Sequence, residues 1–389
     1  MKLLYLAPDP VPAPKGAAVR IARTVRTLSR LGWEVELLTP APALGERLAE
    51  VVHDTVELPE GNFLDRMLAF RAAAAQWLSG RSADLVQFRS IWEGMSALAW
   101  ADRQGRPAVF EAHGFPSIEL PYHFPALRRA PGLLEKLIRE EAAALSAAAL
   151  LITPSRTGAL YLQSRGVSPG RVAVVPNCVD TDQFRPAPPP ERDAPFRIVY
   201  QGTLAPWQGL EPLVEALTRF RGREVELHVV GPSRSAWRRS LGRFSRRCRV
   251  QRMLQHSPPT EQAALAPVMQ TAHVCAAPLV ADARNTVQGC CPIKLLEYMA
   301  AGRPILTTAI APVEELLEHR RDAWLAAPGS PLALAEGIAW LMEHPAEREE
   351  LGRRARGTAE ERFGTELFRD RLGAALERAL DYYSAPGGG

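Results

Sequence analysis

The chain has 389 residues, of which 47% are hydrophobic and 23% charged, and its formal net charge is +4. This length exceeds what one ordinary hydrophobic core supports and predicts two domains, with the composition of a globular protein. No apolar run reaches the roughly 18 residues that a membrane-spanning helix needs. The five cysteines are odd in number and form no C-x-x-C pair, so we expect a reduced, cytoplasmic protein without a zinc site.

The first half of the chain alternates short apolar runs with helical patterns. Residues 2–8 (KLLYLAP) predict a buried strand, and residues 17–32 predict a helix, in which Val19, Ala22 and Val25 recur at helical spacing. Further strands are predicted at residues 33–40, 83–90, 107–114, 149–155 and 172–180. Strands that alternate with helices in this way are typical of a parallel α/β sheet.

The pattern restarts after a proline-rich segment at residues 185–195 (RPAPPPERDAP), which indicates a linker. Strands are predicted within residues 196–209, 224–233, 273–280 and 303–309, and helices at residues 210–220, 294–302 and 366–384. We therefore expect an N-terminal domain at residues 1–186 and a second domain at residues 187–365. A terminal helix at residues 366–385 is expected to pack back toward the first domain.

Ligands of open parallel sheets bind beyond the carboxyl ends of the strands. The predicted strand ends are followed by loops that contain Gly16, Arg89, His113, Gly202, Gly231 and Pro278. If the two domains face each other, these loops line one cleft.

The helix predicted after Pro292 has features of an anion site. Proline suits the first turn of a helix, and the free N–H groups there favour a phosphate. Lys294 adds a positive charge in the first turn, and Glu297 follows three residues later. A phosphate at the helix end and ribose hydroxyls on Glu297 would together bind a nucleoside diphosphate. A solvated Lys–Glu pair is the alternative, and the local pattern alone favours it.

Several segments in the same order resemble the retaining glycosyltransferases of the GT-B fold, family four (group 1). They are PDPVPAPKGAAVRIARTVRTLSRLGWEVELLTP, FEAHG, VAVVPNCVDTDQFRP, VYQGTLAPWQGLEPLVEAL and PIKLLEYMAAGRPILTT. The resemblance covers nearly the whole chain. It implies two Rossmann-like domains with doubly wound parallel sheets that face a central cleft, the first on the acceptor side and the second on the donor side.

The resemblance implies roles for individual residues. Gly16 and Gly202 would let the backbone approach the donor phosphates, His113 would lie at the reaction centre, and Glu297 would hold the ribose. Pro292 and Ile293 would contact the donor at the start of the helix. Gly16 and His113 also have purely structural interpretations, and for Asn177 and Asp180 we favour simple turn hydrogen bonds.

The chain departs from the family pattern at three positions. The family's first glutamate falls on Gly289, and the usual arginine and lysine of the first loop in the second domain are Thr203 and Gln208. Both can still donate hydrogen bonds, but a diphosphate needs positive charge. Lys294 and Arg284 are the nearest candidates to supply it.

Three other features have simpler interpretations. Trp207 covers its loop or packs on the donor sugar, and we favour the first. Cys290 and Cys291 are small residues where the chain turns, although a catalytic thiol at a helix N-terminus is an alternative. The basic run at residues 233–249 is usually a solvated helix face, with nucleic acid or an anionic bilayer as alternatives, and no nucleic-acid motif accompanies it.

The resemblance implies transfer of a sugar from a nucleotide-diphosphate sugar, such as a UDP- or GDP-sugar, to a hydroxyl of a glycan or lipid-linked acceptor. Such chemistry needs no cofactor and no bound metal, because the helix end and basic residues stabilise the leaving diphosphate. The expected setting is cell-surface polysaccharide or glycolipid synthesis, at the inner face of the membrane.

Other functions stay open from the sequence. A non-catalytic partner protein that keeps the fold is the main alternative, because of the three departures. An epimerase would need acid–base carboxylates, and a phosphorylase would need a lysine-bound pyridoxal cofactor. A dinucleotide-dependent dehydrogenase is disfavoured, since no G-x-G-x-x-G follows the first strand.

Overall fold

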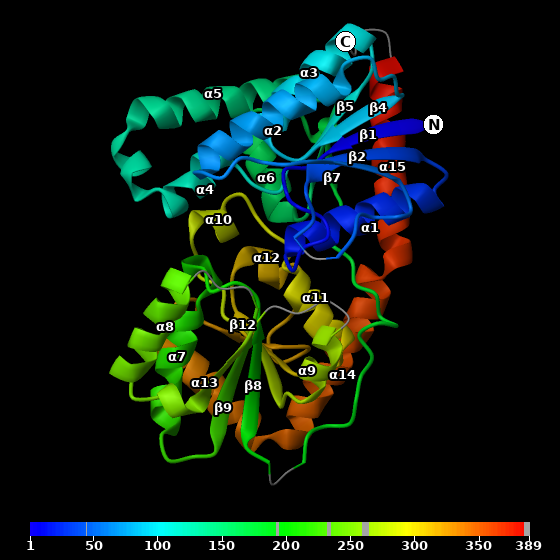
Figure 1. Ribbon diagram of the computed structural model, residues 1–389. Helices are drawn as coiled ribbons and strands as arrows, with labels where there is room; N and C mark the ends of the chain where they lie inside the picture. Colours follow the sequence, from blue (N-terminus) through cyan, green and yellow to red (C-terminus); the bar gives the residue numbers. More distant parts are fainter. Residues whose placement is uncertain (44, 192–193, 232–234, 259–263, 385–389) are drawn as a thin grey trace. The chain divides into compact units, whose positions relative to one another are not determined.

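The computed structural model describes residues 1–43, 45–191, 194–231, 235–258 and 264–384 (Figure 1). Contacts divide the chain into two compact units, which are described separately below. The first unit comprises Met1–Pro176, Val287–Cys290 and the chain from Phe368 onward; the second comprises Asn177–Thr286 and Cys291–Leu367. The division therefore falls ten residues before the boundary expected at residue 186, and it places a short internal segment in the first unit.

The first unit contains a seven-stranded sheet in the order β3-β2-β1-β4-β5-β6-β7, and every neighbouring pair is parallel. The strands are β1 Lys2–Leu6, β2 Glu34–Pro40, β3 Val52–Val56, β4 Leu85–Phe88, β5 Ala108–Glu111, β6 Leu150–Thr153 and β7 Val172–Val174. The strand order reverses direction beside β1, as in doubly wound sheets, so the ends of β1, β4 and β5 are the expected ligand side.

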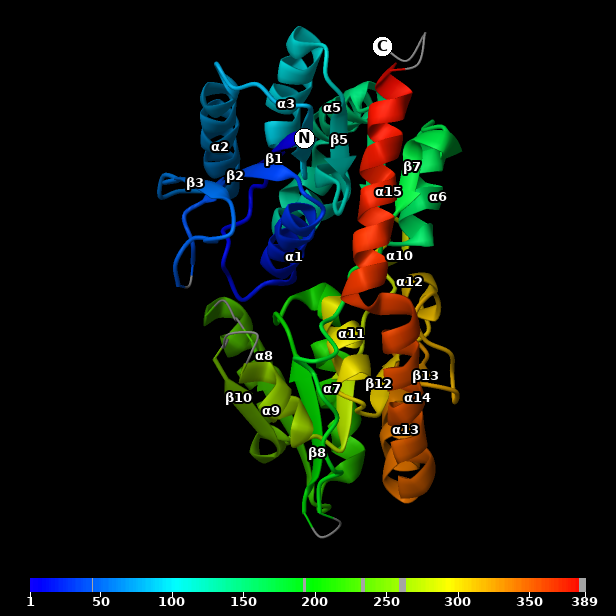
Figure 2. The ribbon, with the colours of Figure 1, turned by 90° about the vertical axis from the view of Figure 1, so that its right-hand side faces the viewer.

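Helices cover both faces of this sheet (Figures 1 and 2). One hydrophobic core joins the sheet to α2, α3, α5 and α6, and on the other face α1 contacts α15 through Arg20, which lies over the Phe368 ring. The helices are α1 Gly16–Arg30, α2 Phe63–Leu78, α3 Ile91–Gln104, α4 Pro116–His123, α5 Pro131–Ala147, α6 Arg156–Ser164 and α15 Thr365–Ser384, with short 3-10 helices at Pro125–Arg129 and Pro169–Arg171.

The second unit contains a six-stranded parallel sheet in the order β10-β9-β8-β11-β12-β13. The strands are β8 Phe196–Gln201, β9 Val225–Val230, β10 Leu254–Ser257, β11 Val274–Ala277, β12 Ile305–Thr308 and β13 Trp324–Ala326. Two parallel-sheet α/β units of this kind are the GT-B architecture that the sequence predicts.

Two cores sandwich this second sheet: α7, α8 and α13 pack on one face and α9, α11 and α14 on the other (Figure 1). The helices are α7 Leu210–Ala216, α8 Ser235–Arg247, α9 Leu265–Gln270, α10 Ala283–Thr286, α11 Ile293–Ala300, α12 Ala311–Glu314, α13 Pro331–Glu343 and α14 Pro345–Phe363, with 3-10 helices at Pro206–Gln208, Leu217–Phe220 and Gln251–Met253. The helix predicted at residues 210–220 thus changes to a 3-10 turn after Ala216.

The proline-rich segment packs on the second unit over its described residues. Arg303 is 1% exposed, and its Nη2 donates to the carbonyl oxygens of Ala187 and Pro188 at 3.1 and 2.9 Å. Arg356 donates in the same way to the carbonyl oxygens of Thr181 and Phe184. Prolines lack a backbone donor, so the carbonyls here depend on side-chain donors. Arg303 therefore holds the described part of this segment against the second unit, and Arg356 holds the residues just before it.

Within the described ranges, no helix is both long enough and apolar enough to cross a bilayer.

Buried histidines make the stability of the fold depend on pH. Burial lowers the pKa values of His53, His113 and His273 to about 4, whereas the unfolded chain protonates them near pH 6.5. Between these values the unfolded state binds more protons, so the free energy of unfolding falls as the pH falls. Glu93 acts in the opposite direction, because burial raises its pKa to about 7.

We therefore expect the free energy of unfolding to drop between pH 6.5 and pH 4, since three histidines outweigh one carboxyl. Each histidine contributes on the order of 1–3 kcal/mol over this window. Urea unfolding followed by circular dichroism at several pH values measures the change. A free energy that is flat, or that rises toward pH 5, would contradict this expectation.

Candidate functional site

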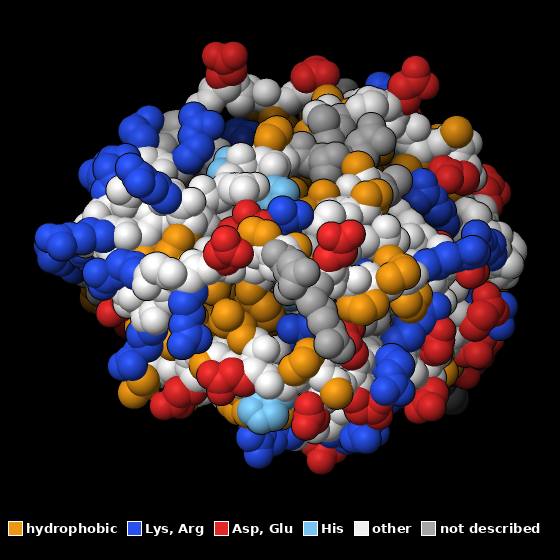
Figure 3. Space-filling model, turned by 90° about the horizontal axis from the view of Figure 1, so that it is seen from below, with side chains coloured by type: hydrophobic (Ala, Val, Ile, Leu, Met, Phe, Trp, Pro, Cys, Tyr) orange, Lys and Arg blue, Asp and Glu red, His pale blue; other side chains and the backbone are white. Residues whose placement is uncertain are grey.

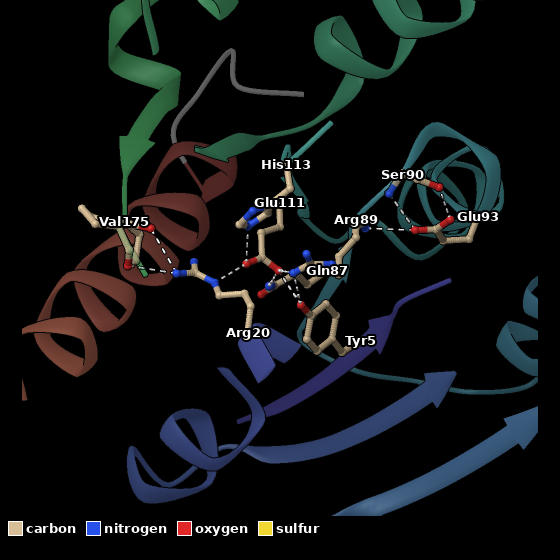
Figure 4. Close-up of polar contacts among 10 residues, drawn as sticks. Tyr5, Arg20, Gln87, Arg89, Ser90, Glu93, Glu111, His113 and Val175 are labelled. Carbon is tan, nitrogen blue, oxygen red and sulfur yellow. Dashed lines mark hydrogen bonds and ion pairs between the residues drawn. The ribbon is translucent and has the colours of Figure 1, made fainter. Parts of the chain in front are cut away.

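The ends of the central strands of the first unit carry a buried polar cluster (Figure 4). Tyr5 on β1 and Gln87 on β4 are paired in register, and Glu111 ends the adjacent strand β5. Arg20 reaches the cluster from α1, and Arg89 follows β4 directly. All five side chains are at most 7% exposed, so the cluster lies inside the first unit.

Glu111 is the centre of this cluster. Its carboxylate accepts hydrogen bonds from Arg20 Nε at 2.8 Å, Arg89 Nη1 at 2.9 Å and Gln87 Nε2 at 3.2 Å, and also from the Tyr5 hydroxyl. Burial favours the neutral acid, but Arg89, Arg20 and His113 outweigh it and hold the pKa of Glu111 well below its usual value. Glu111 is therefore ionised and balances two buried guanidinium groups.

His113 lies directly above this carboxylate. Its Nε2 is 3.0 Å from Glu111 Oε1, and its side chain is 19% exposed. Burial and the nearby Arg89 lower the pKa of His113 to about 4, against the opposing effect of Glu111. At neutral pH the imidazole is therefore uncharged, and because the ionised Glu111 only accepts, Nε2 carries the proton. Nδ1 is then the acceptor nitrogen of the ring.

The sequence pattern predicts His113 as a site residue but none of the five cluster residues. Arg89 was recognised only as a strand-end residue, and Glu111 only as part of the FEAHG segment. Glu111 could have been noticed in the sequence, because a carboxylate at the end of a buried apolar strand needs a hydrogen-bonding or charged partner. The partner Arg20 lies 91 positions away in the chain, which the sequence pattern does not reveal.

In the second unit, the predicted residues Gly202, Gln208 and Lys294 lie together. The Lys294 ammonium hydrogen-bonds to Gln208 Oε1 at 2.6 Å and to the Tyr200 hydroxyl at 3.3 Å, and it lies 4.3 Å from the centre of the Tyr200 ring. A Cβ atom on Gly202 would be 2.7 Å from Lys294 Nζ, and this glycine has a φ of +138°. The absence of a side chain at Gly202 therefore makes room for the ammonium at the end of β8.

Glu297, on the same helix α11, is 1% exposed. Its Oε2 accepts a hydrogen bond of 2.9 Å from Gln201 Nε2, and Tyr298 beside it accepts the Gln201 backbone N–H at 2.8 Å. The alternative of a solvated Lys–Glu pair is wrong for this glutamate, which is buried. A ribose that binds to Glu297 would share or displace the Gln201 amide.

Arg284 and Thr203 have other surroundings. Arg284, on α10, lies 4.9 Å above the ring of Trp207, which is 8% exposed and whose carbonyl accepts from Asn285. Trp207 thus packs beside α10. The carbonyl of Thr203 accepts the Tyr200 hydroxyl at 2.7 Å. Both Arg284 and Thr203 are partly exposed.

The remaining predicted residues lie at helix starts. Gly16 is exposed and is the first residue of α1, in the first unit. Pro292 is the N-cap of α11, and Ile293 is its first helical residue. Both are partly exposed, as a contact with a ligand at this helix end requires.

Asn177 does more than the predicted turn bond, whereas Asp180 behaves as expected. Asp180 Oδ1 accepts the backbone N–H groups of Asp182 and Gln183 at 2.9 and 3.0 Å. Asn177 is 7% exposed, and its side-chain amide donates to the carbonyl of Cys291 at 2.5 Å. The sequence did not predict this contact, in which the Asn177 amide fixes the residue that precedes the N-cap of α11.

Two family models match the chain, one to each unit. Residues 14–183 match the model described as Glycosyltransferase Family 4, and residues 195–344 match the model described as Glycosyl transferases group 1. The chain belongs to the group 1 glycosyltransferases. This confirms the resemblance that its motifs indicate.

Curated relatives of this glycosyltransferase are distant. A D-inositol 3-phosphate glycosyltransferase from Xylanimonas cellulosilytica is 26% identical over 400 residues, covering 95% of this chain and 91% of the relative. A putative colanic acid biosynthesis glycosyltransferase, WcaL from Escherichia coli, is 25% identical and covers 59% and 56% of the two chains. Curated relatives therefore include enzymes named for a phosphorylated inositol and for a polysaccharide.

Solved structures share the fold. Sucrose-phosphate synthase from Thermosynechococcus elongatus superposes with a TM-score of 0.81 at 19% identity, covering 98% of this chain and 99% of that one. HepE from Anabaena, in complex with UDP and glucose, superposes with a TM-score of 0.77 at 18% identity, covering 97% and 99%. Likeness at this identity establishes the GT-B fold of the glycosyltransferase.

Gly289, at the position of the family's first glutamate, is packed tightly in the first unit. Its φ is +75°, and a Cβ atom there would lie 2.4 Å from Ser155 Oγ and 2.6 Å from the Gly158 nitrogen. The preceding Gln288 fixes the segment, because it accepts the Phe115 N–H at 3.0 Å and donates to Glu119 at 2.9 Å. The position therefore has no room for a glutamate side chain in this backbone conformation.

Restoring the family residue by Gly289→Glu is expected to lower stability rather than raise activity. A non-glycine residue at positive φ costs about 1–2 kcal/mol, and the collision with Ser155 and Gly158 adds to this. Gly329→Glu is a matched control, because Gly329 has a φ of +71° and nothing within 4 Å of its Cβ position. Thermal unfolding compares the two variants, and equal shifts in melting temperature would contradict this account.

The described residues contain no group of three or more His, Cys, Asp or Glu side chains that could hold a metal ion. All five cysteines are free thiols, and Cys291 is 5% exposed.

Proposed function

We propose that this glycosyltransferase transfers a sugar, with retention of anomeric configuration, from a nucleotide-diphosphate sugar to a hydroxyl of a glycan or lipid-linked acceptor. The proposed setting is the synthesis of cell-surface polysaccharide or glycolipid on the cytoplasmic side of the membrane. The names of the colanic acid and amylovoran relatives support the polysaccharide setting, and the UDP and glucose bound to HepE support this donor class.

The meeting of Lys294, Gly202 and Gln208 is the observation that carries the proposal. A partly exposed ammonium at the start of α11 adds a full charge to the partial positive charge of the helix end. Together, the ammonium and the helix end form a site for a diphosphate. This site lacks the arginine and the lysine that are usual in the family. Gln208 orients the ammonium through its 2.6 Å hydrogen bond.

The proposed reaction breaks the bond between the anomeric carbon and the diphosphate and forms a bond to the acceptor oxygen on the same face. The acceptor proton passes to a phosphate oxygen of the leaving group, so no pair of carboxylates of glycosidase type is needed. Lys294 and the start of α11 stabilise the charge that develops on the diphosphate. This charge makes a bound metal unnecessary, and we expect activity to persist in the presence of a chelator.

His113 is proposed to orient the transferred sugar at the reaction centre. Its imidazole is neutral and has a fixed tautomer, because Glu111 holds Nε2–H. A neutral ring does not repel the positive charge that develops on the sugar, and its backbone carbonyl can stabilise that charge.

A thermal-shift screen with UDP, GDP, ADP and their sugars tests the donor class. A ligand that binds the native state raises the melting temperature in proportion to its affinity and concentration. We expect one nucleoside diphosphate to raise it more than the corresponding monophosphate, because the second phosphate reaches Lys294. A screen in which no diphosphate stabilises the protein would overturn the proposed donor.

The alternative of a non-catalytic partner rests on Gly289, Thr203 and Gln208, which depart from the family pattern. Transfer or hydrolysis of the donor by purified protein excludes it. Binding of a donor without turnover, across several donors and lipid extracts, would favour it instead.

A further inference from the structure

Over its described side chains, the exposed side of α8 is rich in arginine. Arg238, Arg239, Arg243, Arg246 and Arg247 are all exposed, and the sequence from residue 235 to residue 258 contains no Asp or Glu. Lys and Arg side chains gather at the left edge of Figure 3, the side on which α8 lies in Figure 1. Below, the surface formed by these five residues is called the α8 arginine face.

Several arginines elsewhere in the described chain form ion pairs with acidic side chains. On α14, Arg353 and Arg354 both form ion pairs with Glu350, and similar pairs join Arg26 to Glu50 and Arg356 to Glu360. Among the described residues, no ion pair is found for the arginines of α8. Like charges three or four residues apart destabilise a helix, and an anionic partner would remove this cost.

The arginines surround a shallow hollow. Arg238, Arg239, Arg243 and Arg246 line it around Gly242, where a Cβ atom would have only Arg246 Nη1 nearby, at 3.7 Å. Guanidinium groups bind phosphate oxygens through paired N–H donors. Burial and the charges of Glu215 and Glu211 raise the pKa of Cys248, and neither glutamate lines the hollow.

The apolar side of α8 faces inward. Leu241 is 9% exposed and packs in the core of the second unit with Val250, which is 1% exposed. The ring of Phe244 is partly buried and lies 5.0 Å from the Arg247 guanidinium. In its described side chains the outer surface therefore offers charge and little apolar area, so its binding is electrostatic and falls with salt.

We propose that the α8 arginine face binds the phosphate groups of an anionic phospholipid bilayer. A bilayer presents many phosphates on one surface, which suits five exposed guanidinium groups along one helix. Binding of single-stranded nucleic acid without sequence preference relies on aromatic stacking platforms, and the one ring of the described side chains, Phe244, lies beneath Arg247. The inference goes beyond the proposed reaction, because none of these arginines belongs to the proposed donor site around Gly202, Gln208 and Lys294.

Sedimentation with phosphatidylcholine vesicles, with and without phosphatidylglycerol, tests this proposal on the full chain. We expect binding only to the anionic vesicles, and loss of that binding at high salt. The variant Arg243→Gln/Arg246→Gln should bind about 30-fold more weakly, since each arginine near an anionic surface contributes roughly fivefold. The matched control is Arg353→Gln/Arg354→Gln, which removes two paired arginines from α14 and should bind as the wild type does.

Circular dichroism and the melting temperature establish that both variants are folded, and a variant that fails to fold is replaced by Arg239→Gln/Arg243→Gln. Equal binding to neutral vesicles, unchanged binding of the α8 variant, or equal losses in both variants would overturn the proposal. So would tighter binding to duplex DNA than to anionic vesicles at the same phosphate concentration and salt, which would assign the face to nucleic acid.

Discussion

Replacing Glu111 by Gln is expected to destabilise the first unit by about 3–5 kcal/mol, the usual result of removing one partner of a buried ion pair. The substitution keeps the size of the side chain but leaves the Arg20 and Arg89 guanidinium groups without their shared carboxylate. Both arginines are nearly buried, so water does not replace the lost interaction. Urea unfolding followed by circular dichroism measures the loss.

Glu50→Gln is the matched control for this prediction. It removes the carboxylate from the Arg26–Glu50 pair, in which both side chains are close to half exposed, and such pairs contribute about 0–1 kcal/mol. A Glu111 variant as stable as the Glu50 variant would show that the buried cluster does not support the fold. If the Glu111 variant is folded, its His113 ring should no longer be fixed as the Nε2–H tautomer. The ¹⁵N chemical shifts of the two ring nitrogens measure this change.

Lys294→Ala is expected to weaken the binding of the donor nucleoside diphosphate roughly 10- to 100-fold, because hydrogen bonds to charged groups contribute about 1.5–3 kcal/mol. The side chain is partly exposed, so its removal should leave the fold intact. Isothermal titration calorimetry with the diphosphate selected by the thermal-shift screen measures the change.

Gln208→Ala keeps the positive charge of Lys294 but removes the side chain that orients it. Gln208 is neutral and holds the ammonium through one hydrogen bond, so its loss should weaken binding by no more than about tenfold. Equal and near-neutral effects of the two substitutions would remove Lys294 from the donor site and with it the observation on which the proposed function rests.

The fold could be predicted from sequence where strands are central and fully apolar, and less well at the sheet edges. The strands β1, β4, β5 and β6 are buried over nearly all their length, and their apolar runs are recognisable. The missed strands β3, β10 and β13 lie at sheet edges. Their residues are mostly partly or fully exposed, so neither a continuous apolar run nor a clear alternation marks them.

The grouping of Gly202, Gln208 and Lys294 was predictable because these residues lie in recognisable segments at strand and helix ends. Lys294 and Gly202 follow from the helix start at Pro292 and from the end of β8. The hydrogen bonds that hold the site residues in place were not predictable, since they join distant parts of the chain. Examples are the bond from Asn177 to Cys291 and the bond from Arg20 to Glu111, over separations of 114 and 91 residues.

We propose that this group 1 glycosyltransferase transfers a sugar with retention from a nucleotide-diphosphate donor. Proton NMR of a transfer reaction, recorded as the product forms, reads the anomeric configuration directly. With an α-linked donor, we predict an α-linked product whose formation slows strongly in the Lys294→Ala variant. A β-linked product, or a donor that binds without any transfer, would contradict the account.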